Sequence, residues 1–260
     1  MRPYVISVAA VLFLLPAALL QIVFRLLSLK VADYFPSLFH RGMCRIMGIK
    51  VTVIGQPVTD RPVITVANHW SWLDIPVIGS VGECYFVAKS EISGWPIFGS
   101  LARLQNTIFV NRAAKGRDVA GQVSEITDRL RHKKSVIVFA EGTSNDGNRV
   151  LKFKSSLLAV AKPEDDYRPC VQPLTLAYNK MNGMPMGRSD RHNVAWFGDM
   201  DMGPHLWNFL KVPQIEVTLS YGEPVYYDEF ASRKVLTENV EKTIRNEYTR
   251  LANGRVAAAN

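Results

Sequence analysis

The sequence predicts an α/β protein with a mixed, largely parallel sheet covered by helices, preceded by an N-terminal membrane-associated helical segment. Three observations lead to this class. Short apolar runs such as residues 135–139 (SVIVF) are continuous rather than alternating, which is typical of strands buried on both faces. Segments with helical periodicity separate these runs along the chain. Near the N-terminus, residues 3–24 contain no charged side chain.

As a helix, residues 3–24 would be about 33 Å long, against about 30 Å for the hydrocarbon core of a bilayer. Pro16 would kink that helix, which a bilayer tolerates. Two alternatives stay open: a cleaved signal peptide, whose basic region would be Arg2 alone, and a buried helix of a soluble protein. Arg2 is the one cationic side chain before the segment, whereas five cations follow it closely: Arg25, Lys30, Arg41, Arg45 and Lys50. The excess of positive charge after the segment predicts that the bulk of the chain faces the cytoplasm.

A second helical pattern begins at Pro36, with apolar residues at steps of four along one face and arginines along another. Gly48 is a suitable C-cap for this helix. A short basic amphipathic helix is typical of membrane-surface binding, and an ordinary helix packed on the domain is the equal alternative. We therefore expect a membrane anchor and amphipathic helix over residues 1–48 and a catalytic domain over residues 49–260.

The remaining elements follow from hydrophobic periodicity. Strands are predicted at residues 51–54, 63–67, 84–88, 107–110, 135–139, 171–177, 194–197 and 215–221. Residues 117–131 form one amphipathic helix, because their apolar members recur at steps of three and four. Residues 233–251 show a weaker version of the same pattern.

Composition narrows the class of protein. With 260 residues, 48% hydrophobic and 21% charged, the chain is neither disordered nor collagen-like. The net charge of +8 favours an anionic partner, but no nucleic-acid motif is present. Cys44, Cys84 and Cys170 are odd in number and far apart, which fits a reducing compartment. The chain contains no GxGxxG, P-loop, HExxH or GxSxG motif.

The segment VITVANHWSWLDIP places His69 just beyond a predicted strand and Asp74 five residues later. Side chains at such a strand end lie at the rim of the sheet, where ligands bind in open α/β folds. Asp74 could bond one ring nitrogen of His69 and leave the other free to take a proton from a hydroxyl. Two simpler interpretations remain, because Ser71 and Asp74 also form an acceptable capping box, and His69 could be a structural histidine.

Two further segments carry polar groups at strand ends. Glu141, Gly142 and Thr143 follow the apolar run of residues 135–139, and a glycine there lets backbone amides approach an anion. Arg112 ends another predicted strand, and its planar guanidinium suits a phosphate or carboxylate. Taken alone, the first segment is also an ordinary turn, and Arg112 is also an ordinary surface charge.

Together and in this order, these segments resemble the lysophospholipid acyltransferase family. His69-x-x-x-x-Asp74 looks like its first motif, and residues 109–112 (FVNR) are similar to its second. Residues 139–143 (FAEGT) look like the third, and residues 171–174 (VQPL) look like the fourth. The resemblance covers roughly residues 36–221, and four ordered motifs are far more specific than one.

The resemblance implies an O-acyltransferase that moves a fatty acyl group from acyl carrier protein or coenzyme A to the free hydroxyl of a lysolipid. His69 would be the general base and Asp74 its orienter. Arg112, Glu141, Gly142 and Thr143 would hold the polar head of the acceptor. The resemblance implies no metal or bound cofactor, and places the protein at the bacterial inner membrane with its catalytic domain in the cytoplasm.

One departure concerns the acceptor. The family commonly has arginine after Glu-Gly-Thr, where it holds a phosphate, but this chain has Ser144. Arg149, Lys152 or Lys154 could supply the missing cation. Residues 141–157 (EGTSNDGNRVLKFKSSL) look most like the bacterial subgroup that acylates lyso-ornithine lipid, whose head group carries a carboxylate and an amine. Lyso-ornithine lipid is therefore the expected acceptor, with 1-acylglycerol-3-phosphate as the alternative.

Other classes of protein stay open from the sequence. A membrane lipid-binding module could keep the fold without catalysis, and a thioesterase or lipase would hydrolyse acyl chains without an acceptor. A metal hydrolase is a remote alternative, because its candidate ligands match no common metal motif. Those candidates are His192, Asp199, Asp201 and His205.

Overall fold

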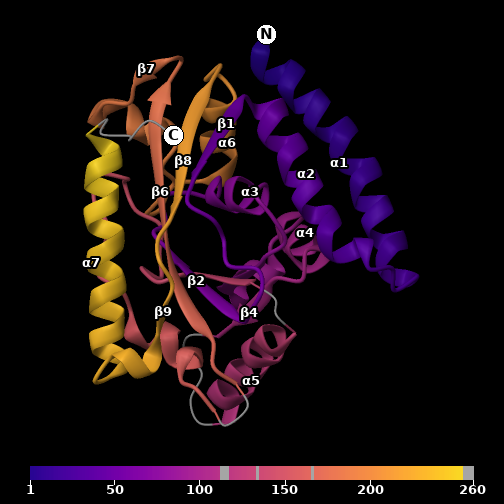
Figure 1. The fold of residues 1–260 in the computed structure, drawn as a ribbon. Helices are drawn as coiled ribbons and strands as arrows, with labels where there is room; N and C mark the ends of the chain where they lie inside the picture. The colour runs from indigo at the N-terminus through magenta and orange to yellow at the C-terminus, as the bar shows by residue number, and fades with distance from the viewer. Residues whose placement is uncertain (112–116, 133–134, 165–166, 254–260) are drawn as a thin grey trace.

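The computed structural model describes residues 1–111, 117–132, 135–164 and 167–253. In this part of the chain nine strands form one sheet, and helices cover both of its faces (Figure 1). The α-helices are α1 (Arg2–Leu26), α2 (Val31–Met47), α3 (Asp74–Gly79), α4 (Phe98–Leu104), α5 (Arg117–Arg131), α6 (Met202–Phe209) and α7 (Arg233–Ala252). Short 3₁₀ helices are η1 (Ser90–Gly94), η2 (Ser155–Ala161), η3 (Arg188–Asn193) and η4 (Tyr227–Glu229).

The strands confirm the predicted class of a mixed, largely parallel sheet. They are β1 (Ile49–Ile54), β2 (Val63–Ala67), β3 (Tyr85–Lys89), β4 (Ile108–Val110), β5 (Ser135–Phe139), β6 (Cys170–Met181), β7 (Met184–Pro185), β8 (Ile215–Tyr221) and β9 (Val225–Tyr226). The main order is β1-β8-β6-β2-β5-β3-β4, with β7 and β9 paired to β6. Strand β6 is antiparallel to β8 but parallel to β2. β6, β2, β5, β3 and β4 are parallel to one another, and β1 is parallel to β8 at the other end of the sheet.

Most predicted strands are present, but the one at residues 194–197 is wrong. Val194 and Ala195 are fully buried and follow η3 without forming a strand. An apolar run of this length reports burial, and burial alone does not distinguish a strand from a packed loop. The helix predicted over residues 117–131 is α5, and the one over residues 233–251 is α7 with one more residue.

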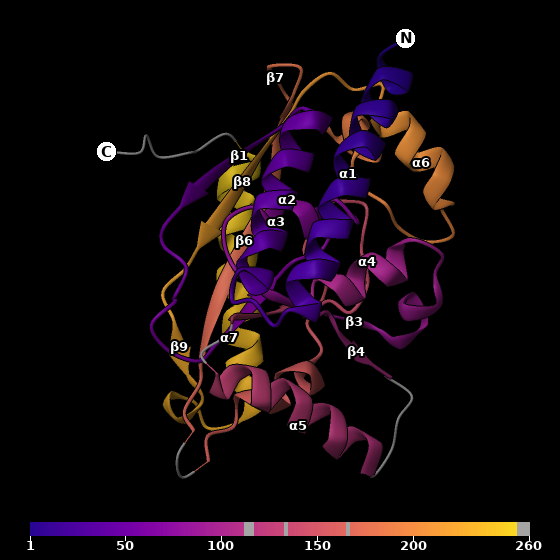
Figure 2. The same ribbon diagram turned by 90° about the vertical axis from the view of Figure 1, so that its right-hand side faces the viewer.

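The N-terminal helices form a hairpin against one side of the domain (Figure 2). α1 is the one helix in the described residues that is long and apolar enough to cross a bilayer. Phe13 of α1 stacks on Phe39 of α2, with ring centroids 5.6 Å apart. α2 begins at Val31, five residues before the predicted start, so Pro36 lies inside the helix. Gly48 ends α2 in the left-handed conformation, as predicted.

Polar contacts tie both ends of α1 to the rest of the chain. At its beginning, the Arg2 guanidinium donates to the Pro213 carbonyl at 2.8 Å. Toward its end, the Gln21 side chain donates to the Leu104 carbonyl at 2.9 Å. Because both ends are attached to the same domain, α1 lies alongside that domain. On the other face of the sheet, α7 packs against β6 (Figure 1).

Candidate active site

Two neighbouring parallel strands deliver the central residues of the site to one edge of the sheet. β2 and β5 are paired in register, with Ala67 opposite Phe139. The loops that follow both strands therefore leave the sheet side by side, and they carry His69 and Glu141. The rim position expected for His69 is confirmed, and the pairing of β2 with β5 adds Glu141 to the same edge.

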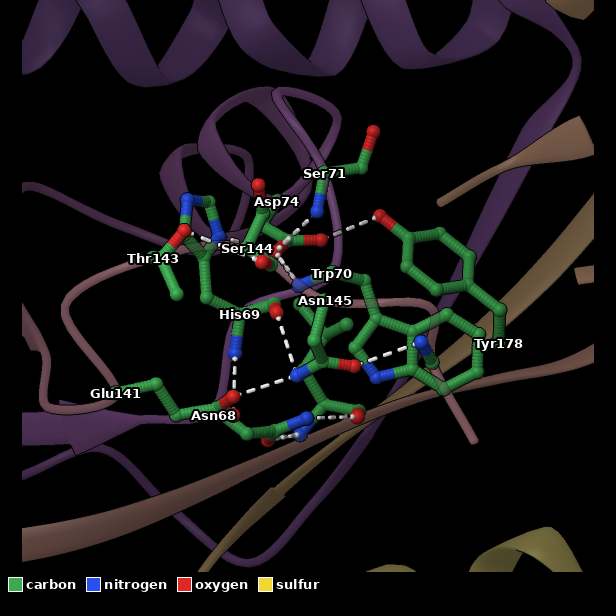
Figure 3. A network of polar contacts seen from close by, with 12 residues as sticks. Asn68, His69, Trp70, Ser71, Asp74, Glu141, Thr143, Ser144, Asn145 and Tyr178 are labelled. Carbon is green, nitrogen blue, oxygen red and sulfur yellow. Dashed lines mark hydrogen bonds and ion pairs between the residues drawn. The ribbon is translucent and has the colours of Figure 1, made fainter. Parts of the chain in front are cut away.

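His69 and Asp74 are in direct contact (Figure 3). The Nδ1 atom of His69 lies 2.7 Å from Oδ2 of Asp74. A carboxylate only accepts hydrogen bonds, so Nδ1 carries a proton, and in the neutral form of the ring the free lone pair is on Nε2. The imidazole stacks on Phe139 with ring centroids 4.0 Å apart, and its side chain is 19% exposed. The ring is therefore fixed in position and still reachable from outside.

Asp74 is fully buried and accepts four hydrogen bonds. Its Oδ2 accepts from the backbone amides of Trp70 and Ser71 as well as from His69. Its Oδ1 accepts from the Tyr178 hydroxyl at 2.8 Å. The predicted capping box is not formed, because Asp74 is the first residue of α3, the N-cap is Leu73, and no side chain of the described residues caps the helix. Burial and the neighbouring Asp74 raise the pKa of Tyr178 well above its ordinary value, which keeps its hydroxyl proton available to Asp74.

Glu141 joins the two loops. Its Oε1 accepts from the His69 backbone amide at 3.1 Å, and its Oε2 accepts from the Asn145 side chain at 2.5 Å. The side chain is 2% exposed. Burial raises the pKa of Glu141 to about 7, although the hydrogen bonds from His69 and Asn145 act in the opposite direction.

Asn145 extends this connection along the loop. Its backbone amide and its side chain both donate to the His69 carbonyl, at 3.1 and 3.0 Å. Its Oδ1 accepts from the Gly147 amide at 2.7 Å. Gly147 has a φ of +69°, and a Cβ atom there would come within 2.4 Å of the Trp70 ring. Glycine is thus required both by the backbone conformation and by the tight packing on Trp70.

Several residues of this network were missed in the sequence. In the sequence, Asn145 is typical only of a turn, together with Asp146 and Gly147. The Tyr178 hydroxyl reaches Asp74 from β6, and the Arg191 guanidinium donates to the Gly147 carbonyl at 2.7 Å. Tyr248 of α7 donates to the same carbonyl. No local pattern identifies partners that lie 44 to 104 residues away, and only the tertiary fold brings them together.

The other residues singled out in the sequence occupy different environments. Gly142 is buried with a φ of +74°, and Thr143 is exposed in the same loop. Arg149 and Lys154 are both exposed, and the Lys154 backbone amide donates to the Ala140 carbonyl. Arg112 lies outside the described residues. The structure therefore brings together the parts of the first and third motifs.

The metal-hydrolase alternative has no site in the part of the chain that the structure describes. No group of three or more His, Cys, Asp or Glu side chains there could hold a metal ion. His205, one of its candidate ligands, is buried, and its Nδ1 accepts a hydrogen bond from the Trp72 indole at 3.1 Å. This histidine is therefore engaged in packing α6 against Trp72.

Comparisons with known proteins point to one family. A family model described as "Acyltransferase" matches residues 50–176. The lyso-ornithine lipid O-acyltransferase of Rhizobium meliloti is 41% identical over 243 residues, which cover 92% of this chain and 83% of that protein. The protein of the same name from Brucella abortus is 41% identical over 214 residues, which cover 81% of this chain and 80% of that protein.

A solved structure shares the fold. The crystal structure of the 1-acyl-sn-glycerophosphate acyltransferase PlsC from Thermotoga maritima superimposes with a TM-score of 0.60 at 24% identity, covering 86% of this chain and 80% of that chain. At this identity the likeness concerns the fold alone. The sequence matches, by their length and identity, show that this chain belongs to the acyltransferase family. It is a membrane-associated enzyme that transfers acyl groups from an acyl donor to a lipid acceptor.

Proposed function

We propose that this enzyme acylates the free hydroxyl of lyso-ornithine lipid, using a fatty acyl thioester as donor, to give ornithine lipid. The observation that carries the mechanism is the buried, four-fold hydrogen-bonded Asp74 in contact with a partly exposed His69. Support for the acceptor comes from the relatives that are 41% identical and named for this lipid. Ser144, where a phosphate-binding arginine is expected from the family resemblance, favours an acceptor without phosphate.

In this mechanism His69 is the general base and Asp74 its orienter. Nε2 of His69 takes the proton of the acceptor hydroxyl as the oxygen attacks the thioester carbonyl. Asp74 stabilises the imidazolium that forms, and the histidine returns the proton to the departing thiol. The negative charge on the tetrahedral intermediate needs preorganised donors. The backbone amides of Thr143 and Ser144, which make no hydrogen bond within the described residues, are suited to this task.

Glu141 and Gly142 support the acceptor site indirectly in this proposal. The carboxylate of Glu141 is fully used in holding His69 and Asn145, so it positions the base and the loop that faces the acceptor. Gly142 allows the left-handed turn that presents Thr143. In this proposal Glu141 keeps the loop rigid, and Gly142 lets the loop expose its backbone donors.

Charged residues beyond the turn are proposed to select the head group. Burial opposes ionisation of Asp146, but hydrogen bonds from Asn148 and the nearby Arg149 and Arg191 outweigh it and lower its pKa. Asp146 is therefore ionised at neutral pH and could meet the amine of the ornithine head. Arg149, with Arg112 and Lys154 as further candidates, would meet the carboxylate.

The donor and the orientation are also proposals. An excess of eight positive charges suits both anionic lipid and an acidic acyl carrier protein, and coenzyme A is the alternative donor. We propose that residues 1–48 anchor the enzyme to the inner membrane, with the domain of residues 49–260 on the cytoplasmic side. The cations that follow α1 support this orientation.

Acyl transfer by the purified full-length chain tests the proposal. Labelled acyl carrier protein thioester is offered with lyso-ornithine lipid, lysophosphatidic acid, or no acceptor. We expect ornithine lipid to form, and His69→Ala to lose about 10²–10⁴-fold in turnover. His192→Ala, an exposed histidine in the η3 segment, is the matched control and should keep full activity. Fatty acid release without acceptor would instead identify a hydrolase, and retention of activity within a few-fold in His69→Ala would reject His69 as the base.

Ser144→Arg tests the acceptor assignment separately. An arginine at this position restores a cation beside the catalytic loop, so the ratio of kcat/KM for lysophosphatidic acid over lyso-ornithine lipid should rise. An unchanged ratio would show that this position does not select the head group.

A further inference from the structure

Outside the N-terminal hairpin, exposed large apolar side chains concentrate on the η1–α4 segment, on α6 and just before α6. We call these five residues the aromatic patch: Trp95, Ile97, Phe98, Met200 and Trp207. The Ile97 side chain is the most open, at 66% exposed, and the other four lie between 36% and 39%. Ordinary surfaces carry single exposed apolar residues, whereas a contiguous apolar patch marks an interaction site.

The aromatic patch is continuous with the outer face of α1. The Trp207 ring packs edge-on against Tyr4 of α1, with centroids 4.9 Å apart. Trp95 packs edge-on against Trp196, with centroids 6.1 Å apart, and Trp196 donates through its indole to the Met200 carbonyl. α6 and the η1–α4 segment lie along one edge of the molecule beside α1 (Figure 2). Because α1 is tied to the domain at both ends, a membrane that contacts the side of α1 also reaches this edge.

Ile97 adopts a backbone conformation that is sterically unfavourable for a β-branched residue. Its φ is +64° and its ψ is −62°, and the Phe98 amide donates to the Pro96 carbonyl at 2.7 Å across it. This is the rare and strained form of γ-turn, and a β-branched residue at positive φ is a genuine outlier. The turn pushes an isoleucine side chain outward, where it gains little from packing in the protein. Strain of this kind points to a function for the side chain that it presents.

We propose that the membrane-binding surface of this enzyme extends from α1 onto the catalytic domain, and that the aromatic patch enters the lipid bilayer at the boundary of head groups and acyl chains. Tryptophan is the residue enriched at this depth. Asp199 and Asp201 flank Met200, and burying carboxylates in hydrocarbon is costly, so the insertion is shallow. This inference rests on the membrane association of the enzyme and is independent of the identity of its acceptor.

The aromatic patch is connected to the catalytic loop through Trp196. The backbone amide of Trp196 donates to the carbonyl of Trp70, the residue after His69, at 3.0 Å. A bilayer seated on the aromatic patch would thus be coupled by rigid contacts to the loop that holds the base. The lipid acceptor would reach the site without leaving the membrane.

A fluorophore that reports its depth tests this surface in the full-length chain. An environment-sensitive label is placed on Ile97→Cys, with Cys84 replaced by serine because Cys44 and Cys170 are buried. The matched control is Val235→Cys, at a residue that is 43% exposed; its helix, α7, lies across the sheet from α1 (Figure 1). In vesicles of phosphatidylcholine and phosphatidylglycerol, we expect nitroxide lipids to quench the label at 97 at least about threefold more than the label at 235.

Equal quenching at the two positions would overturn the proposal. So would a label at 97 that is already shielded without vesicles in a chain that sediments as a dimer, because the patch would then be an interface between copies. Neither of these results would change the outcome of the acyl-transfer assay. Failure of this proposal can therefore be distinguished from failure of the proposed function.

Two further variants separate insertion from folding. Glycine adopts positive φ freely, so Ile97→Gly should keep or raise the thermal unfolding temperature while vesicle binding weakens about fivefold. Ile97→Met keeps an apolar side chain and should retain binding. A glycine variant that unfolds earlier and binds vesicles normally would show that Ile97 serves the fold, and would overturn its role at the membrane.

Discussion

Asp74→Asn is the most direct test of the catalytic arrangement, because it removes the negative charge of the side chain and keeps the shape of the side chain. Three of the four donors to Asp74 converge on Oδ2, and the fourth is the Tyr178 hydroxyl on Oδ1. An asparagine that turns its oxygen toward the three donors leaves its amide facing Tyr178. A hydroxyl both donates and accepts, so Tyr178 can rotate to accept that amide. The variant should therefore fold normally.

The loss of activity follows from the missing charge. Two unit charges about 4 Å apart attract by about 4 kcal/mol at an effective dielectric constant of about 20. Removing the carboxylate opposite the imidazolium of His69 should thus slow acyl transfer by about 10³-fold. The measurement is kcat for labelled acyl transfer at saturating acceptor, with circular dichroism to follow the fold.

Tyr178→Phe is the matched control for Asp74→Asn. It removes one hydrogen bond from Asp74 and keeps the charge, so its kcat should fall by less than about tenfold. Its stability should drop by about 1–3 kcal/mol, because one carboxylate oxygen is left buried without a partner. A folded Asp74→Asn variant within about fivefold of the parent enzyme, or no slower than Tyr178→Phe, would refute the orienting role of the charge.

Two further predictions concern stability. Because the pKa of Glu141 is raised to about 7 in the fold, the folded state binds more protons than the unfolded state between the ordinary value of 4.5 and about 7. The stability of the parent relative to Glu141→Gln should therefore fall by about 3 kcal/mol as pH rises from 4 to 8, and parallel denaturant titrations with no such trend would contradict a raised pKa. Gly147→Ala should destabilise by at least about 2 kcal/mol, because its Cβ meets Trp70 at a positive φ. Gly121→Ala in α5, where a Cβ meets nothing within 4 Å, should be neutral or stabilising, and equal thermal unfolding of these two alanine variants would argue against the tight packing on Trp70.

The contact between His69 and Asp74 was predictable because it is local. Five residues separate them, and a strand followed by a helix leaves few ways to place that short loop. Glu141 was predictable as a neighbour because β2 and β5 are continuously apolar, and adjacent parallel strands end at the same edge. These inferences need only short-range sterics and the rule that apolar strands are buried.

Other features depended on contacts that no short segment of sequence encodes. The predicted strand at residues 194–197 is a buried loop, because apolar composition reports burial without specifying backbone conformation. Pro36 was interpreted as a helix start, whereas packing against α1 and α3 lets α2 begin a turn earlier. The outward turn at Ile97 is not visible as a pattern, because its neighbours resemble an ordinary apolar stretch.

The amino-acid sequence alone determined the α/β class, the apolar N-terminal helix and the pairing of the base with its carboxylate, because periodicity and close spacing act over a few residues. Only the tertiary structure decided that Tyr178, Arg191 and Tyr248 brace the catalytic loop, and that α1 lies along the domain beside an aromatic surface. Such contacts join residues tens to hundreds of positions apart, and their geometry exists only once the whole sheet and its helices have packed.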